Sequence, residues 1–287
     1  MTGGRLVLVG TPIGNLGDLS PRASSVLGGA DVIACEDTRV TRKLLSHAGI
    51  PPRRLLSVHA HNEATAAKDV VDLVAGGATV AMVTDAGLPG ISDPGERLVK
   101  AVTSAGLKVD VVPGPSAALA ALVVSGLPAD RFCFEGFLPR KGGERAARLA
   151  AIAVEPRTVV LFESPRRVRQ TVANLASACG ASRPLVIGRE MTKLHEEVWR
   201  GTMEAALSWL SSLEPRGEYV LVVGGAPATA GVDDHAIEST LSDRLVAGDD
   251  PKAAVALVAG ALGVPRRRVY DAGLRLKNAG RMDEPSR

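Results

Sequence analysis

Aromatic side chains are scarce in this chain. Phe, Trp and Tyr together make up 3% of its 287 residues, whereas 46% of the residues are hydrophobic. A composition rich in Ala, Val, Leu and Gly favours closely packed α/β layers over a β-sandwich. The shortage of aromatic rings also disfavours a protein that reads single-stranded RNA by stacking bases on its side chains.

Cysteine, metal-ligand motifs and long apolar runs are also in short supply. Cys35, Cys133 and Cys179 are odd in number and far apart, and the five histidines have no metal-ligand spacing. These features predict reduced thiols and no metal site. No apolar run approaches the roughly 18 residues that span a bilayer, and the first residues do not form a signal peptide. We therefore expect a soluble, cytoplasmic protein.

Motifs for nucleotide chemistry are missing from the first strand-to-helix loop. Residues 10–15, Gly-Thr-Pro-Ile-Gly-Asn, lack both the G-x-G-x-x-G spacing of dinucleotide-binding folds and the Gly-Lys-Ser/Thr of a P-loop. The sequence thus disfavours hydride transfer and the use of nucleoside triphosphates.

Net charge is small but unevenly distributed. The chain carries +3 in total. Residues 251–287 hold eight Lys or Arg against three acidic residues, which gives this segment +5 and leaves −2 for residues 1–250. The asymmetry predicts a basic appendage with a polyanionic partner, and a solvated helical face is the alternative.

Strand-like and helix-like patterns alternate along the first half of the chain, which predicts βαβ units and a parallel sheet. The predicted strands are residues 5–10, 31–37, 55–60, 79–84 and 108–113, and the predicted helices are residues 21–29, 38–48, 63–75, 94–106 and 115–125. Ser20 before Pro21, and Asp93 before Pro94, are expected to cap two of these helices.

A second series of strands follows Gly126-Leu127-Pro128. Its third and fourth strands have the spacing of a hairpin, so we expect a mixed sheet. The predicted strands are residues 132–137, 158–164, 184–191, 197–202 and 219–225. The predicted domains are an N-terminal α/β domain at 1–117, a second α/β domain at 118–226 and a small basic helical module at 236–280.

The C-terminal module follows a turn-rich linker at residues 226–235. A helix, a turn around Gly263-Val264 and a basic helix after Pro265 have the layout of a small helix-turn-helix module. Its last helix carries an apolar stripe of Val269, Ala272, Gly273 and Leu276, which leaves Arg267, Arg268 and Arg275 on the exposed side.

Two loops carry the strongest functional signal. Residues 84–95 and 112–117 follow predicted strands and are rich in Gly and Pro, and the first contains Asp85 and Asp93. Ligands of open parallel sheets bind at the carboxyl ends of strands, where glycine allows the backbone to approach closely. We therefore expect a small-molecule site built largely from backbone, with helices opening near Asp93 and Ser116 to supply N–H groups.

An ordered set of short motifs identifies a family resemblance. The motifs are, in chain order, GTPIGNLGDLSPRA (10–23), ACEDTR (34–39), HNE (61–63), TDAGLPGISDPG (84–95), VPGPSA (112–117), FLPRK (137–141), FESPRR (162–167) and GREMTKLHEE (188–197). Together they resemble the tetrapyrrole methylase superfamily, and within it the 16S rRNA (cytidine 2′-O)-methyltransferase family. The resemblance is dense over residues 5–225, and the basic C-terminal module also fits that branch.

The resemblance implies an S-adenosylmethionine (SAM) site in a cleft between two α/β domains. It also implies a homodimer, with 16S rRNA of the small ribosomal subunit as substrate. The superfamily's usual Gly-Gly-Asp-Pro loop is replaced by Thr-Asp-Ala-Gly at residues 84–87. The positions that match the cofactor site are Pro12, Gly14, Asp85, Ala86, Gly87, Ile91, Ser116, Ala117, Glu163 and Gly224.

Methylation of a ribose hydroxyl depends on alignment of the nucleophile, and a side chain can accept or orient the hydroxyl proton. The candidates at the cleft are Glu36, Asp37, Arg39, Asn62, Glu63, Arg166, Lys193 and Glu196, of which Glu36, Asp37, Arg39, Glu63 and Lys193 are preferred. For Glu36 and Asp37 the alternative is a helix N-terminal charge or an ion pair with a nearby arginine. For Glu63 it is an acidic first-turn residue.

Basic side chains are expected to contact RNA phosphates, with solvated helix surface as the alternative. They are Arg140, Lys141 and Arg166 near the cleft and Arg267, Arg268 and Arg275 in the C-terminal module. Two other functions stay open. One is methylation of corrin or porphyrin carbons, which the basic tail and the motifs at 34–39, 61–63 and 162–167 disfavour. The other is a non-catalytic role in ribosome assembly.

Overall fold

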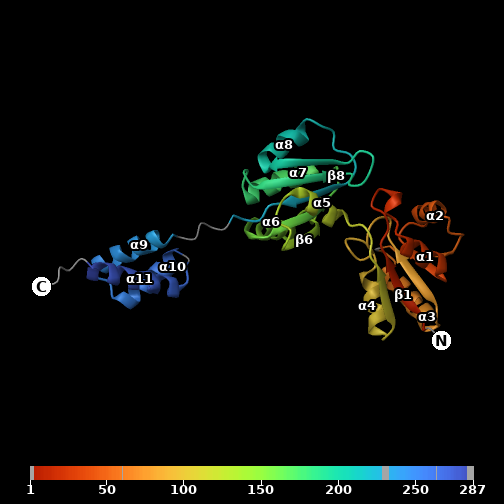
Figure 1. Ribbon diagram of the computed structural model, residues 1–287, viewed down its shortest axis with the longest axis horizontal. Helices are drawn as coiled ribbons and strands as arrows, with labels where there is room; N and C mark the ends of the chain where they lie inside the picture. Colours follow the sequence, from red (N-terminus) through yellow and green to blue (C-terminus); the bar gives the residue numbers. More distant parts are fainter. Residues whose placement is uncertain (1–2, 60, 228–232, 263, 283–287) are drawn as a thin grey trace. The chain divides into compact units, whose positions relative to one another are not determined.

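The computed structural model describes residues 3–59, 61–227, 233–262 and 264–282. The chain divides into two compact units, Met1–Gly225 and Ala226–Arg287. Among the described residues, the first unit contains two five-stranded sheets and the second contains three helices (Figure 1). No helix in the described part of the chain is both long and apolar enough to cross a membrane.

The first sheet is wholly parallel, with strand order β3-β2-β4-β1-β5. Its strands are β1 (Arg5–Val9), β2 (Val32–Cys35), β3 (Arg54–Ser57), β4 (Thr79–Val83) and β5 (Lys108–Val112). Every residue of β2 and nearly every residue of β4 is buried, as expected for central strands covered on both faces. The structure confirms the predicted parallel sheet.

Helices cover both faces of this sheet (Figure 1). The short 3-10 helix η1 (Leu16–Asp18) precedes α1 (Pro21–Gly29), which shares one face with α2 (Thr38–His47). The other face carries α3 (Glu63–Ala75) and α4 (Glu96–Ser104). The helices that follow the neighbouring strands β1 and β4 lie on opposite faces, so the chain turns to opposite sides beyond these strands. Such a divergence forms the crevice in which open α/β sheets bind ligands.

Serine residues cap two of the helices. The Ser20 hydroxyl accepts the N–H of Ala23 at 3.1 Å, with Pro21 in the first turn of α1, as predicted. Ser116 is the N-cap of α5 (Ala117–Ser125), and its side chain accepts the N–H of Leu119 at 3.5 Å.

The predicted cap at Asp93 is wrong. Helix α4 begins at Glu96, and its N-cap is Gly95, whose φ of +139° lies in the region that favours glycine. The carboxylate of Glu63, on α3, accepts the N–H of Gly95 at 2.8 Å and the N–H of Arg97 at 3.0 Å. Since the capping group comes from another helix, local sequence rules point to the wrong residue.

The second sheet is mixed, with order β6-β7-β10-β8-β9, and only β6 and β7 pair in parallel. Its strands are β6 (Phe132–Phe137), β7 (Thr158–Glu163), β8 (Pro184–Arg189), β9 (Glu197–Thr202) and β10 (Tyr219–Val223). Strands β8 and β9 form the predicted hairpin. One face packs against α6 (Gly143–Val154), α7 (Val168–Cys179) and α8 (Met203–Ser211).

Helix α5 covers the other face of the second sheet, although it follows the last strand of the first sheet. Its Ala118, Ala121 and Leu122 are buried against Val160 of β7 and Val220 of β10. The predicted boundary between residues 117 and 118 thus coincides with the start of α5, inside one compact unit. The division into three domains remains a prediction.

The second unit consists of α9 (Asp234–Val246), α10 (Pro251–Leu262) and α11 (Arg266–Met282). These helices bury a core of their own, made of Ile237, Leu241, Ala254, Val258, Ala259, Val269 and Ala272. Val269 and Ala272, from the predicted stripe of α11, are fully buried. Gly263, the predicted turn residue, lies outside the described residues, as do residues 228–232 of the predicted linker.

Candidate functional site

A pocket of about 430 Å³ opens at the carboxyl end of the first sheet. Segments that follow four of its strands line the pocket: Ile13 after β1, Glu36 after β2, residues 85–88 and 91–93 after β4, and Ser116 with Ala117 after β5. The second sheet contributes Phe137, Phe162, Glu163, Ser164, Pro165, Met191, Glu218, Tyr219 and Val220. The volume falls within the roughly 300–1,000 Å³ of small-molecule sites.

Thr11 fixes the loop after β4 to the loop after β1. Its N–H donates to the carbonyl of Gly87 at 2.9 Å, and the N–H of Gly87 donates back to the carbonyl of Thr11 at 3.2 Å. The buried Thr11 hydroxyl donates to the carbonyl of Thr84 at 3.2 Å. Gly87 has a φ of +77°, which suits glycine. The pocket wall is therefore held by backbone, as the sequence predicted.

Gly14 lies beside the pocket, where the loop after β1 meets the β8–β9 hairpin. A Cβ atom on Gly14 would lie 2.4 Å from Lys193 Cγ and 2.8 Å from Thr192 Oγ1. A larger residue at position 14 would push the two segments apart. The close approach explains a glycine here without direct ligand contact.

Five carboxylates line the pocket, and three of them accept hydrogen bonds within the described part of the protein. Asp85 accepts the N–H of Asp37 at 3.1 Å, and the backbone of Asp85 acts on the Glu36 carboxylate in the direction that lowers its pKa. Glu163 accepts from the Ser164 N–H and the Thr171 hydroxyl, and Glu218 from Lys193 Nζ at 2.9 Å. The side chain of the fifth, Asp93, makes no hydrogen bond or ion pair with the described part of the chain.

The pocket raises the pKa of three of these carboxyl groups. The pKa of Asp93 rises to about 7, through burial of the group and then through the charges of Glu36, Asp85 and Glu218. Burial also raises the pKa of Glu36 and that of Asp85. Outside the pocket, the side-chain hydrogen bond from Arg39 lowers the pKa of Asp37 to about 2. Negative groups gathered in this way favour a ligand that carries positive charge.

Two phenylalanines, Phe137 and Phe162, add an apolar surface to the pocket lining. The chain has four Phe residues, and three of them cluster here. The ring centroids of Phe134 and Phe162 are 5.0 Å apart, and those of Phe137 and Phe162 are 5.7 Å apart. Phe137 is 51% exposed and Ile91 48% exposed, although both line the pocket. Such surfaces suit a flat, apolar ring.

The structure brings together seven of the ten predicted cofactor-site residues. Asp85, Ala86, Gly87, Ile91, Ser116, Ala117 and Glu163 all line the pocket. Pro12 is buried next to it, and Gly14 contacts the hairpin. Gly224 lies past the far end of β10, where its N–H donates to the carbonyl of Pro184 at 2.9 Å. Since Tyr219 at the start of that strand lines the pocket, Gly224 is a full strand length away from it.

Of the preferred catalytic candidates, only Glu36 lines the pocket. Asp37 is the N-cap of α2 and pairs with Arg39 at 2.6 Å, which is the alternative considered from the sequence. Glu63 is 7% exposed, and its carboxylate caps α4. Lys193 Nζ lies 2.9 Å from carboxylate oxygens of both Glu190 and Glu218, and so holds Glu218 in place.

Three predicted RNA-binding side chains of the first unit are exposed: Arg140, Lys141 and Arg166. Arg140 and Lys141 closely follow the pocket-lining Phe137, and Arg166 directly follows the pocket-lining segment Phe162–Pro165. Their neighbours Arg145 and Arg167 are used internally. Arg145 is 9% exposed and donates to the carbonyl of Pro139, and Arg167 pairs with Glu163 at 3.2 Å.

The three predicted arginines of the second unit differ from one another. Arg267 is exposed and forms no ion pair with the described residues. Arg268 pairs with Asp234 of α9 at 2.9 Å, and Arg275 pairs with both Asp234 and Glu238 at 2.9 and 2.6 Å. Arg275 is exposed as predicted and Arg268 is half-buried, and their ion pairs join α11 to α9. RNA contact by the three arginines remains a prediction.

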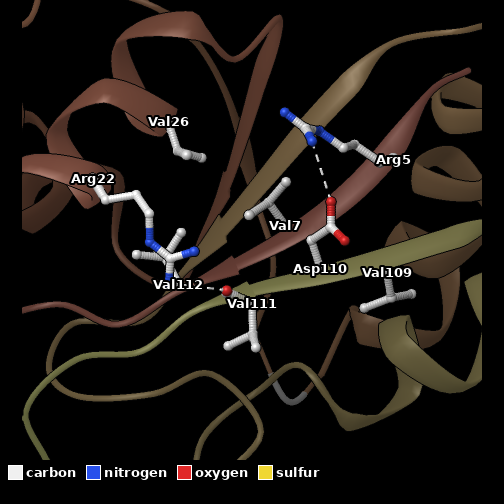
Figure 2. A pocket seen from close by; sticks show the side chains of 8 residues that line it. All are labelled: Arg5, Val7, Arg22, Val26, Val109, Asp110, Val111 and Val112. Carbon is white, nitrogen blue, oxygen red and sulfur yellow. Dashed lines mark hydrogen bonds and ion pairs between the residues drawn. The ribbon is translucent and has the colours of Figure 1, made fainter. Parts of the chain in front are cut away.

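A second cavity, of about 510 Å³, lies beside the edge strand β5 (Figure 2). Arg5 pairs with Asp110 at 3.2 Å, and the Arg22 guanidinium donates to the carbonyl of Val111 at 3.4 Å. These basic groups thus have partners within the chain. Arg22 also covers an exposed carbonyl of an edge strand, which protects the edge from pairing with another chain. None of the predicted site residues lines this cavity.

Several pocket residues were not predicted from the sequence. They are Ile13, Leu88, Ser92, Asp93, Phe137, Phe162, Ser164, Pro165, Met191, Glu218, Tyr219 and Val220. The two Phe residues carried a usable signal, because they belong to a rare residue type and stand inside the quoted motifs. Glu218 carried none, since only the pairing of β10 with β7 and β8 brings it to the pocket.

Two protein-family models match this chain, one within each of its two compact units. Residues 5–207 match the family described as Tetrapyrrole (Corrin/Porphyrin) Methylases, and residues 240–277 match the RsmI C-terminal HTH domain. A protein of Xylella fastidiosa named Ribosomal RNA small subunit methyltransferase I is 45% identical over 94% of this chain and 98% of its own length. Its namesake in Synechocystis is 40% identical over 96% of this chain and 100% of its own length.

Solved structures share the fold of the first unit. The methyltransferase CobJ has a TM-score of 0.59 at 22% identity, over 78% of this chain and 95% of its own. A uroporphyrin-III C-methyltransferase from Thermus thermophilus, complexed with S-adenosylhomocysteine, has a TM-score of 0.56 at 21% identity, over 77% of this chain and 97% of its own. At this identity the likeness concerns the fold alone. The full-length relatives and the two matched regions establish more: the chain belongs to the tetrapyrrole methylase family, among the proteins named ribosomal RNA small subunit methyltransferase I.

Proposed function

We propose that this protein is a SAM-dependent methyltransferase that methylates the ribose 2′-oxygen of a cytidine in 16S rRNA of the small ribosomal subunit. One observation carries the proposal. A pocket lined by both apolar and acidic side chains lies at the carboxyl end of a parallel sheet, in a chain related over nearly its full length to proteins named ribosomal RNA small subunit methyltransferase I. Methylation of rRNA follows from the relatives, and the 2′-oxygen of cytidine follows from the motif resemblance.

The residues present in the pocket fit SAM. The molecule has a flat adenine, a ribose, and a methionine part with an ammonium and a carboxylate. Ile91, Phe137 and Phe162 supply an apolar surface for adenine. The lining carboxylates suit the ammonium and the sulfonium, and the first turn of α5 after Ser116 suits the carboxylate.

The protein's part in catalysis is to bind, orient and exclude water. When bound, SAM supplies a methyl group already activated on a sulfonium. Loops fixed by Thr11 and Gly87 hold the pocket wall without rearrangement, and the Lys193 ion pair holds Glu218 at its edge. Alignment of a nucleophile in such a fixed site accounts for much of the acceleration in a transfer reaction.

RNA is held by basic side chains outside the pocket. Arg140, Lys141 and Arg166 are exposed next to its Phe-bearing segments. Arg267 offers a further unpaired charge in the second unit, among the described residues. Binding through phosphates makes the affinity salt-dependent. The cytoplasmic location expected from the cysteine pattern and the homodimer implied by the resemblance belong to this proposal, and sedimentation at low protein concentration tests the dimer.

Calorimetry with SAM and tritium transfer from labelled SAM test the proposal together. The acceptors are 30S subunits, naked 16S rRNA and uroporphyrinogen. We expect SAM binding, and label in RNA at a position resistant to alkaline cleavage because its 2′-oxygen is methylated. Label in uroporphyrinogen alone would identify a tetrapyrrole methyltransferase instead. Absence of SAM binding would leave a ribosome-assembly role.

A further inference from the structure

We propose that Asp93 is the group that accepts the proton of the attacking ribose 2′-hydroxyl. The inference rests on the proposed function and names a catalytic residue for it. Asp93 belongs to the loop after β4, which the sequence predicted to form part of a small-molecule site, and the one role predicted for Asp93 itself was that of a helix cap. That role is taken by Gly95 and Glu63, which leaves the Asp93 carboxylate without a structural task.

Elimination among the pocket carboxylates supports this choice. Asp85, Glu163 and Glu218 each accept hydrogen bonds from backbone or side chains of the protein, and the backbone of Asp85 acts on the Glu36 carboxylate in the direction that lowers its pKa. A carboxylate whose lone pairs are already engaged is a weaker proton acceptor, because protonation breaks those bonds. The Asp93 carboxylate has no partner among the described residues, and it lines the cavity.

The backbone holds Asp93 in a defined place. Ser92, directly before it, has a φ of +64°, which is uncommon for a residue with a side chain. A Cβ on Gly136 of β6 would lie 2.9 Å from Ser92 Oγ, so the loop packs against the second sheet at this point. The left-handed turn is thus supported by a contact between the two halves of the first unit. A fixed acceptor of this kind is what proton transfer in an aligned complex requires.

The charged groups around Asp93 also favour its role as a proton acceptor. The charges that act on Asp93 are all negative: Glu36 at the end of β2, Asp85 in the same loop and Glu218 at the start of β10. Asp93 is exposed in part, and its partial burial in the pocket together with these charges raises its pKa to about 7. An acceptor with a pKa near the working pH is both ionised in a useful fraction and basic enough to take a proton.

The proposed step balances. The 2′-oxygen forms a bond to the methyl carbon, the carbon–sulfur bond breaks, and its electron pair stays on sulfur. The hydroxyl proton moves to a carboxylate oxygen of Asp93. A carboxylate and a sulfonium become a neutral acid and a neutral thioether, so the pocket loses a pair of opposite charges. The proton then leaves to solvent.

The test compares the wild-type protein with Asp93→Asn and Asp93→Ala, and with Glu96→Gln as a matched control. Glu96 is an exposed carboxylate three residues further on that does not line the pocket. Single-turnover methyl transfer to 30S subunits is followed from pH 5.5 to pH 9, and affinity for S-adenosylhomocysteine is measured by calorimetry. We expect a loss of about 10²–10³-fold in rate for both Asp93 variants, unchanged affinity, and loss of the pH inflection near 7. The control keeps all three properties.

A second experiment measures the pKa of Asp93 directly and does not depend on enzymatic turnover. Carbon-13 NMR of carboxyl-labelled Asp, with Asp93→Asn used for assignment, should show one resonance that titrates near pH 7. Wild-type activity with Asp93→Asn within threefold of it, or an Asp93 titration near pH 4, would overturn the inference alone. An affinity loss as large as the rate loss would make Asp93 a cofactor ligand and also overturn it. Failure of the wild-type protein to methylate any RNA would instead overturn the proposed function.

Discussion

At the scale of single residues, carboxylates of the same type have different tasks. Glu163 lines the pocket, yet its oxygens accept from the Ser164 N–H at 2.8 Å and the Thr171 hydroxyl at 2.6 Å, and it pairs with Arg167 at 3.2 Å. Its side chain is fully buried. We infer that Glu163 shapes the pocket by tying β7 to α7, and that contact with the cofactor is secondary.

Glu163→Ala should lower the free energy of unfolding by about 3 kcal/mol, because it leaves a buried hydroxyl and a guanidinium without their partner. Urea unfolding at pH 7 measures this, with the exposed Glu204→Ala in α8 as control. Unchanged stability together with lost S-adenosylhomocysteine binding would assign Glu163 to the ligand instead.

Asp93 should make stability depend on pH in the direction opposite to most carboxylates. Its folded-state pKa of about 7 lies above the value of 3.8 for a free Asp. Between these two values the folded state binds more protons than the unfolded state, so this group's contribution falls as pH rises and is fully lost above pH 7. Asp93→Asn should therefore raise Tm relative to wild type at pH 8 and not at pH 4. Equal Tm differences at both pH values would contradict this.

At the scale of elements, helix α4 depends on a carboxylate from α3. Glu63 is 7% exposed, and it receives the N–H groups of Gly95 and Arg97. The pocket loop from Asp85 to Asp93 ends immediately before this helix. The cap therefore stabilises the helix and also fixes one end of the pocket loop.

Glu63→Ala should lower the free energy of unfolding by about 2–4 kcal/mol, because two N–H groups lose a charged acceptor. It should also weaken S-adenosylhomocysteine binding, since the loop loses its anchor. Glu63→Gln keeps an acceptor and should recover most of both, whereas Glu96→Ala in the same helix serves as control. If Glu63→Gln is inactive but as stable as wild type, Glu63 acts on the reaction directly.

In helix α11, Arg268 and Arg275 form ion pairs with α9, whereas Arg267 forms none with the described residues. Arg267→Glu should weaken RNA binding and reduce its salt dependence, because it removes a phosphate contact, with α11 unchanged. Arg268→Glu places two acidic groups together at Asp234 and should destabilise the helix packing by up to about 1 kcal/mol. Filter binding at several salt concentrations and hydrogen exchange of α11 amides distinguish the two. Equal effects of both variants on exchange would make Arg267 structural.

At the scale of the whole molecule, the two units have separate cores. The core of the second unit consists of residues from α9, α10 and α11, and the pocket is lined by residues of the first unit. Cofactor binding and the C-terminal contribution to RNA binding are therefore separable in principle.

A chain that ends at Gly225 should fold and bind S-adenosylhomocysteine within about threefold of the full-length affinity, since its pocket and core are intact. Its affinity for 30S subunits should fall, and the slope of log affinity against log salt should decrease by about one for each lost phosphate contact. Full methylation by the shortened chain would show that the second unit is dispensable.

The sequence predicted every strand, and the Gly-Pro loops that it singled out line the pocket, because hydrophobic periodicity and such loops are local signals. Ser20 was found for the same reason, as its cap lies three residues away. The contacts of Glu63, Glu218 and Arg268 could not be predicted from the sequence, because their partners lie 25 to 34 residues away along the chain. Gly224 was carried over from the resemblance, and the direction of β10 removes it from the pocket.

Composition and periodicity alone determined two sheets covered by helices, a parallel arrangement of the first sheet and a basic C-terminal module. Burial of the apolar faces of strands and helices leaves few other arrangements. The packing of strands and helices decided which carboxylate is free. Sequence treats Asp93 and Glu63 as acidic residues at two helix starts. Only the tertiary structure turns one into a cap and leaves the other facing a cavity, because hydrogen bonds between distant segments are settled when the layers pack.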